Sequence, residues 1–200
     1  MKMWTRRAAR YAAVLAVAGG VAIATTTPAS AATPNTAVGI QAAGILPLGP
    51  LVVSTFPGTS PVILTGVDLP PLLTVGAVGA ETGPTTAHAA VAGLSVSLPT
   101  LASVTVGAVE SSCAYDPSTG DVTGETDVAN GTIKLLGIET VLEADPAPNT
   151  TVTLPAGLGS LTLNQQTVEA DGTLAVNAIA IDLLGLEHIV IARSVCNDAP

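Results

Sequence analysis

Residues Gly157 to Cys196 read GLGSLTLNQQTVEADGTLAVNAIAIDLLGLEHIVIARSVC, and this stretch decides the fold. Asp171-Gly172 and Gly185 divide it into three runs rich in Leu, Val and Ile, at 160–168, 173–184 and 188–196. Aspartate and glycine favour turns here, because both tolerate the backbone conformations that turns need. We therefore predict three consecutive antiparallel strands, the last of which ends on a cysteine.

The chain before this stretch shows the same pattern of short strands. Prolines interrupt residues 38–80 often enough to exclude long helices, so Leu51–Phe56 and Val62–Val67 are expected to be edge strands. About ten short strands at spacings near ten residues predict an all-β fold. We expect an antiparallel β-sandwich, with a β-barrel as the alternative.

Two local patterns make more specific predictions. Asn130-Gly131 lies between strand-like runs at 122–129 and 132–138, and this dipeptide favours a two-residue type I′ hairpin. A strand is also expected up to Pro99, with strict alternation of its side chains between two faces. One face would then carry His88, Ala90, Ala92, Leu94, Val96 and Leu98, and the other Ala89, Val91, Gly93, Ser95 and Ser97.

The N-terminus has the composition of an export signal. Four basic residues precede an apolar segment at 11–24, and Ala29-Ser30-Ala31 follows as a cleavage pattern. The apolar segment is shorter than the roughly twenty residues of a membrane-spanning helix, so we predict a signal-peptide helix cleaved after Ala31 and no stable membrane anchor afterwards. The expected organisation is a signal peptide at 1–31, a short polar entry at 32–37 and one β-rich domain at 38–200.

Without the predicted signal peptide the chain is strongly acidic, and this charge excludes some classes of binding partner. Only two of the six basic residues, Lys134 and Arg193, lie beyond residue 10, whereas all fifteen acidic residues do, so the net charge becomes 2 − 15 = −13. Such a chain offers no cationic surface to phosphates, so we expect neither nucleic-acid binding nor attraction to anionic lipid. Phe56 and Tyr115 are its only aromatic residues, which leaves no platform for stacking sugars or bases.

The two cysteines, Cys113 and Cys196, lie 83 positions apart. An even number of cysteines in an exported chain favours a structural disulfide, and two free buried thiols are the alternative. A redox role is not expected, because the chain has no C-x-x-C motif.

The residues that could carry out chemistry are few. A serine hydrolase would need His88 or His188 beside a nucleophilic serine, yet the chain lacks the G-x-S-x-G motif. We expect both histidines to be structural or exposed and the chain not to be an enzyme, with a secreted hydrolase as an alternative. Neither histidine has the spacing of a zinc site.

Four acidic residues are the candidate metal ligands. They lie within twelve positions of one another, and calcium prefers several carboxylate oxygens. Their spacing is not that of an EF-hand, and a solvated strand face is the other interpretation. Calcium is the only candidate cofactor, and its candidate ligands are Asp116, Asp121, Glu125 and Asp127.

Polar residues also interrupt the apolar strands of the closing stretch. We expect the amides of Asn164 and Asn177 to bond neighbouring backbone or each other, because buried amides need partners. Arg193 is expected to pair with Asp182 or Glu187 across the last hairpin.

Three segments of this stretch, Gly159–Gln166, Gly172–Ala178 and Ile189–Ser194, carry a resemblance to a known family. Together with the upstream Glu110–Ala114, they are similar to the choice-of-anchor P family of secreted actinobacterial proteins. The resemblance implies an exported, β-rich surface or secreted domain with no assigned activity. The last residues show no sorting motif, apolar tail or basic end, so a protein that is released or held non-covalently is expected.

These observations predict an exported, non-enzymatic structural or binding module of the bacterial cell surface or extracellular space. It would be secreted, with loose association to the cell wall and an unidentified envelope or extracellular partner. The alternative is a self-assembling surface subunit, because β-branched strands with sparse charge suit edge-to-edge pairing.

Overall fold

Short β-branched runs, separated by proline, glycine and asparagine, form the regular structure of this chain. The computed structural model describes residues 34–44, 47–69, 73–98, 102–135, 137–154 and 157–197, and within them it has thirteen strands and no helix. The predicted signal peptide over 1–31 and its cleavage after Ala31 lie outside these residues. The described part of the chain also contains no helix long and apolar enough to cross a membrane.

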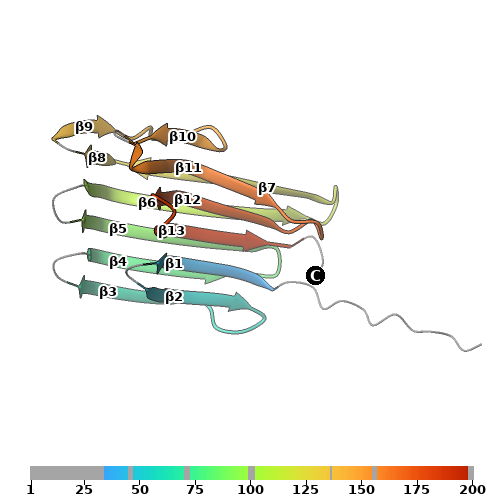
Figure 1. The fold of residues 1–200 in the computed structure, drawn as a ribbon. Helices are drawn as coiled ribbons and strands as arrows, with labels where there is room; N and C mark the ends of the chain where they lie inside the picture. Colours follow the sequence, from blue (N-terminus) through green and yellow to red (C-terminus); the bar gives the residue numbers. More distant parts are fainter. Residues whose placement is uncertain are drawn as a thin grey trace, which may run out of the picture. The chain divides into compact units, whose positions relative to one another are not determined.

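The strands form two antiparallel sheets (Figure 1). The six-stranded sheet has the order β10-β11-β12-β13-β1-β2, and its strands are β1 (Asn35–Gly44), β2 (Leu48–Phe56), β10 (Thr150–Thr153), β11 (Gly159–Val168), β12 (Leu174–Leu183) and β13 (Glu187–Cys196). The seven-stranded sheet has the order β3-β4-β5-β6-β8-β9, with β7 also paired to β6. Its strands are β3 (Val62–Leu69), β4 (Leu73–Thr82), β5 (Thr86–Leu98), β6 (Ala102–Asp116), β7 (Asp121–Ala129), β8 (Thr132–Leu135) and β9 (Ile138–Val141).

The two sheets pack face to face as a sandwich, which confirms the predicted fold class. Strand β13 contacts β5 and β6, while β1 contacts β4 and β5. Both sheets keep open edges, so the barrel alternative is wrong. The three strands predicted between Gly157 and Cys196 are β11, β12 and β13, and β2 and β3 lie at sheet edges as expected.

In the long strands, every second side chain faces the core, and this alternation shifts by one position once along the strand. In β5 the buried residues are Ala87, Ala89 and Val91, followed by Leu94 and Val96. The strict alternation predicted for this strand is therefore wrong beyond Val91. The change occurs at Gly93, whose φ of 64° lies in the left-handed region. A shift of one position moves every later side chain of a strand to the other face.

These shifts in neighbouring strands lie side by side, in a transverse line that we call the crease. The pairings on either side bring together Gly66, Gly76, Gly93, Gly107 and Asn130 in the seven-stranded sheet. In the six-stranded sheet they bring together Val52, Gly39, Ala192, Ala178 and Asn164. Every second residue along each line has positive φ, namely Gly66, Gly93 and Asn130 in one sheet and Val52, Ala192 and Asn164 in the other.

The crease also explains why the hairpin predicted at Asn130-Gly131 is wrong. Ala129 pairs with Ala108, and Thr132 pairs with Thr105, so β7 and β8 continue along β6 in one register. A type I′ turn needs positive φ at both central residues, whereas only Asn130 has it, at 53°. One left-handed residue interrupts a strand without reversing it.

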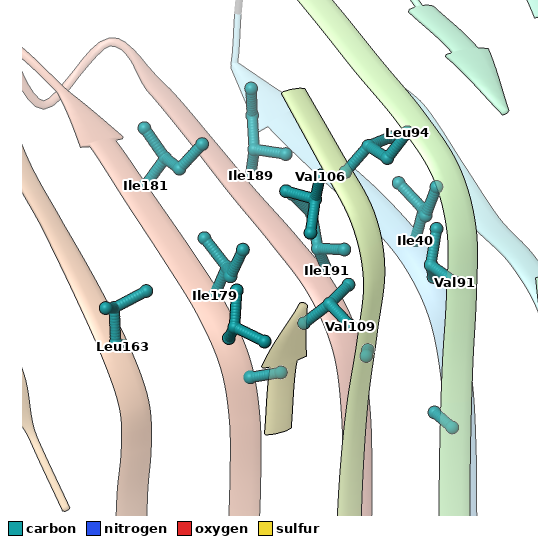
Figure 2. Packing of buried hydrophobic residues seen from close by; sticks show 14 of the residues in the cluster. Ile40, Val91, Leu94, Val106, Val109, Leu163, Ile179, Ile181, Ile189 and Ile191 are labelled. Atoms are coloured by element: carbon teal, nitrogen blue, oxygen red, sulfur yellow. The ribbon is translucent and has the colours of Figure 1, made fainter. Parts of the chain in front are cut away.

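The core lies between the sheets, and aliphatic side chains on both sides of the crease fill it. Figure 2 shows Ile179 and Ile191 of the six-stranded sheet beside Val106 and Val109 of the seven-stranded sheet. All four are at most 3% exposed. Because the chain has so few aromatic residues, Val, Leu, Ile and Ala supply the burial that stabilises the fold.

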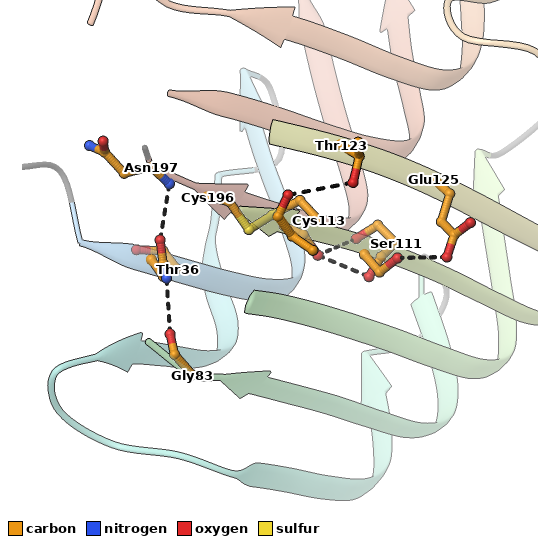
Figure 3. Close-up of a disulfide and its surroundings, with 12 residues drawn as sticks. Thr36, Gly83, Ser111, Cys113, Thr123, Glu125, Cys196 and Asn197 are labelled. Carbon is orange, nitrogen blue, oxygen red and sulfur yellow. Dashed lines mark hydrogen bonds between the residues drawn. A yellow bond between two sulfur atoms is a disulfide. The ribbon is translucent and has the colours of Figure 1, made fainter. Parts of the chain in front are cut away.

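The predicted disulfide joins the two sheets. Cys113 of β6 is bonded to Cys196 of β13, with Cα atoms 5.9 Å apart (Figure 3). Beside it, the hydroxyls of Ser111 and Ser194 form a buried hydrogen bond of 2.7 Å between the same strands. The alternative of two free thiols is therefore wrong for this structure.

The chain begins its first strand earlier than predicted, within the expected polar entry at 32–37. Asn35 is the first residue of β1 and is only 6% exposed. Its amide nitrogen donates to the carbonyls of Gly83 and Pro84, and its amide oxygen accepts from the backbone N–H of Asn197. Asparagine is polar, but these three hydrogen bonds allow it to be buried.

Candidate functional site

The hairpin between β6 and β7 carries two of the four candidate calcium ligands. Asp116 and Asp121 pair with each other where the hairpin begins and ends. The Asp116 carboxylate accepts hydrogen bonds from the hydroxyl and the backbone N–H of Ser118, at 2.6 and 2.8 Å. These bonds favour the ionised form and lower the pKa of Asp116 below its usual value. Asp116 therefore orders the turn.

The other two candidates, Glu125 and Asp127, lie along β7 and are exposed. Among the described residues, no three acidic, histidine or cysteine side chains are arranged to hold a metal ion. The structure therefore does not bring the four predicted ligands together as a calcium site. It brings Glu125 and Asp127 to the outward face of the seven-stranded sheet instead.

On this outward face, the strand registers collect polar residues from neighbouring strands. One transverse row contains Glu81 of β4, His88 of β5, Ser112 of β6 and Glu125 of β7. The next row places Glu110 of β6 opposite Asp127 of β7. Cross-strand neighbours on one face lie roughly 5 Å apart, so these side chains form one continuous polar patch.

Hydrogen bonds connect the members of this patch. The Nε2 atom of His88 lies 3.3 Å from Oε2 of Glu110, and their side chains are 44% and 54% exposed. The hydroxyl of Ser112 donates to Glu125 Oε1 at 3.4 Å. Glu110 thus contacts His88 and Glu125 contacts Ser112, so the Ser112 hydroxyl bonds a carboxylate rather than an imidazole.

Two adjoining hollows open around His88, and we call them together the acidic hollows. One, of about 360 Å³, is lined by Thr86, Ala87, His88, Ser112, Cys113, Ala114, Thr123, Gly124 and Glu125. The other, of about 320 Å³, is lined by His88, Glu110, Ser111, Ser112, Glu125, Thr126, Asp127 and Asp145. Four carboxylates contribute to these walls, and no Lys or Arg does within the described chain. The surface attracts cations and repels anions.

Sequence reasoning did not identify most of this patch. His88 was expected to be structural or exposed, and Glu110 and Ser112 carried no motif. Their meeting depends on the registers of β5, β6 and β7, and no residue pattern along one strand shows these. Alternating polar residues at 110, 112, 125 and 127 were the only available signal.

His188 lies elsewhere, exposed on the outward face of the six-stranded sheet. It pairs with Asp182 of β12 and Ala43 of β1. The structure therefore does not bring the two histidines to one site, because they belong to different sheets.

Arg193 has a different partner from the two that were predicted. It pairs with Asn177 of β12, and its Nη1 donates to Asn177 Oδ1 at 3.2 Å. The amide nitrogen of Asn177 donates in turn to Oε1 of Gln165 at 2.7 Å. Burial lowers the pKa of Arg193, and the charge of Glu169 opposes that shift. Asp182 and Glu187 lie on the other side of the crease from Arg193, so the predicted pairs with them are wrong.

Asn164 and Asn177 both find partners but do not bond each other. Asn164 bonds backbone, as predicted, whereas Asn177 bonds the side chains of Gln165 and Arg193 instead. The Asn164 amide nitrogen donates to the carbonyl of Pro146 at 2.8 Å. Its amide oxygen accepts from Gln166, which also donates to the Gly124 carbonyl in the other sheet. These amides are structural links between strands and sheets.

Comparison of the chain with models of known protein families, with characterised proteins and with solved structures finds no match. The similarity to the choice-of-anchor P family is neither supported nor contradicted by this result and stays a prediction.

Proposed function

We propose that this chain is an exported, non-enzymatic binding module of the bacterial cell surface or extracellular space. The acidic hollows would bind a cationic group, such as a Lys or Arg side chain, on a partner protein of the envelope. A disulfide is consistent with an extracellular protein, since such bonds persist in oxidising compartments. The similarity to secreted actinobacterial proteins supports the same location.

One observation carries the proposed binding role. Glu110, Glu125, Asp127 and Asp145 line adjoining hollows with a single histidine among them. Lys and Arg groups donate several hydrogen bonds and accept none, so a wall of carboxylates with hydroxyl-bearing neighbours such as Ser112 suits them. The same side chains suit catalysis less well, because the Ser112 hydroxyl bonds Glu125 and not His88.

Titration calorimetry with a tetralysine peptide at low ionic strength tests the proposal. Binding is expected for the wild-type protein and should weaken on the order of two- to fivefold in Glu110→Gln and in Asp127→Asn, as for exposed ion pairs. Glu139→Gln is the matched control, because Glu139 is exposed on β9, outside the hollows. Equal binding of tetraglutamate, or equal losses in all three variants, would contradict the proposed site.

A second measurement separates binding from catalysis. Hydrolysis of generic ester and peptide substrates should be absent in the wild type and unchanged in His88→Ala. If the wild type is hydrolytically active and His88→Ala abolishes that activity, the protein is a hydrolase and the proposed binding function is wrong.

A further inference from the structure

One side of the sandwich carries almost no charge. Between Arg10 and Asp68 the sequence contains no Asp, Glu, Lys, Arg or His residue, and all fifteen acidic residues follow. The described part of this segment forms β1, β2 and most of β3. Strands β2 and β3 are the last strands of their sheets and contact each other (Figure 1). On this side of a strongly acidic molecule, strands β1, β2 and β3 therefore carry a single charge, Asp68.

Strand β3 presents an open backbone edge on this side. It pairs with β4 from Val62–Ala80 to Leu69–Leu73, and its other edge has no strand partner among the described residues. Ile63 is 72% exposed and Leu64 is 41% exposed, so apolar side chains flank that edge on both faces. An edge that is long and apolar is a template for pairing with another strand.

The other open edges are protected in ways that β3 is not. Strand β2 contains Pro50, the left-handed Val52 and a register shift opposite β1. Strands β9 and β10 have only four residues each, and β9 carries Glu139. Strand β7, which pairs only with β6 among the described strands, carries Asp121, Glu125 and Asp127. Prolines, irregularities, short length and charge are the usual features that block edge pairing. Strand β3 has eight residues, no proline and no register shift opposite β4. Its left-handed residue, Gly66, leaves the pairing on both sides in one register, and its one charge, Asp68, lies near its end.

We propose that β3 is a self-association edge, at which a second copy of this chain adds its own β3 antiparallel and continues the seven-stranded sheet across a two-fold axis. A two-fold contact needs a surface that complements itself, and an antiparallel edge with a single charge near one end does so. With Val62 of one copy opposite Leu69 of the other, the two Asp68 carboxylates lie about 17 Å apart, at opposite ends of the pair. Self-repulsion of a chain this acidic disfavours contacts elsewhere.

Sedimentation equilibrium of the wild-type protein and two lysine variants tests this inference. The wild-type mass should rise to twice the monomer mass with concentration, and more readily at high salt, because screening weakens the repulsion between copies. Ile63→Lys should weaken dimerisation at least tenfold. The matched control, Ile138→Lys, changes an isoleucine of similar exposure (61%) at the opposite edge of the same sheet and should dimerise like the wild type.

Hydrogen exchange supplies a second readout that a change in stability alone would not give. Amides of residues 62–69 should become protected as the protein concentration rises, while those of β9 stay unchanged. A monomer at every concentration and salt level would overturn the inference, as would a dimer that Ile138→Lys dissociates and Ile63→Lys does not. A peptide of another protein bound to β3 in place of a second copy would also overturn it. Tetralysine binding at the acidic hollows is measured separately and does not depend on this result.

Discussion

Replacing Gly93 with alanine tests whether the crease needs a left-handed residue. A non-glycine residue in this region costs about 1–2 kcal/mol, because its Cβ approaches the following carbonyl. The added Cβ would lie 3.4 Å from the Gly76 nitrogen and 3.5 Å from its Cα, which are ordinary contacts, so no steric term is added. Alanine also reduces the conformational entropy of the unfolded chain, which stabilises the protein by about 0.4–1 kcal/mol. We expect a net loss of about 1 kcal/mol in the free energy of unfolding.

Gly79→Ala is the matched control, because it makes the same chemical change in the neighbouring strand β4. Gly79 is not in the left-handed region, and a Cβ there would meet nothing within 4 Å. This variant should be neutral or more stable by up to about 1 kcal/mol. The unfolded-state terms cancel between the two variants, so their difference of about 1–2 kcal/mol measures the left-handed penalty itself. Equilibrium unfolding in urea gives both values, and equal effects of the two substitutions would refute the role of the crease.

Two further predictions concern the disulfide and the β6–β7 turn. Replacing both Cys113 and Cys196 with serine opens a loop that spans 83 positions, and the chain-entropy model predicts a loss of roughly 4–5 kcal/mol; denaturant unfolding without reductant measures it, and a loss below about 1 kcal/mol would mean that the reduced unfolded chain is already constrained. The pKa of Asp116 is lowered from 3.8 by Ser118, so the stability that Asp116 contributes is present above pH 3.8 and is lost as the pH falls through the lower folded-state pKa. In a plot of the free energy of unfolding against pH, Asp116→Asn should reduce the fall in stability at acid pH. An unchanged fall would show that the turn hydrogen bonds contribute nothing.

Much of the architecture was readable along the chain. Proline spacing excluded helices, the Asp171-Gly172 turn separated β11 from β12, and the two cysteines predicted the disulfide that the structure contains. These features depend on local conformational preference or on covalent chemistry. Such preferences act over a few residues and leave a pattern in the sequence.

The alternation within β5 and the interruption at Asn130 could not be read in the same way. A left-handed residue within a strand looks like a turn signal, as Asn130-Gly131 did. Whether it reverses the chain depends on the neighbouring strand, and here β6 runs past the interruption and pairs on both sides of it. Val52 and Ala192 adopt the same conformation without any sequence signal, because only their neighbours in the crease require it.

The sequence alone determined the class of the fold, the positions of most strands, the acidity of the chain and the uncharged segment that precedes Asp68. Tertiary structure alone decided which side chains meet. His88, Glu110, Ser112 and Glu125 are joined by strand register, and register is set by burial of the opposite face in the core. The same long-range pairing leaves β3 at an open edge, because the choice of neighbour for each strand depends on contacts between residues distant in the chain.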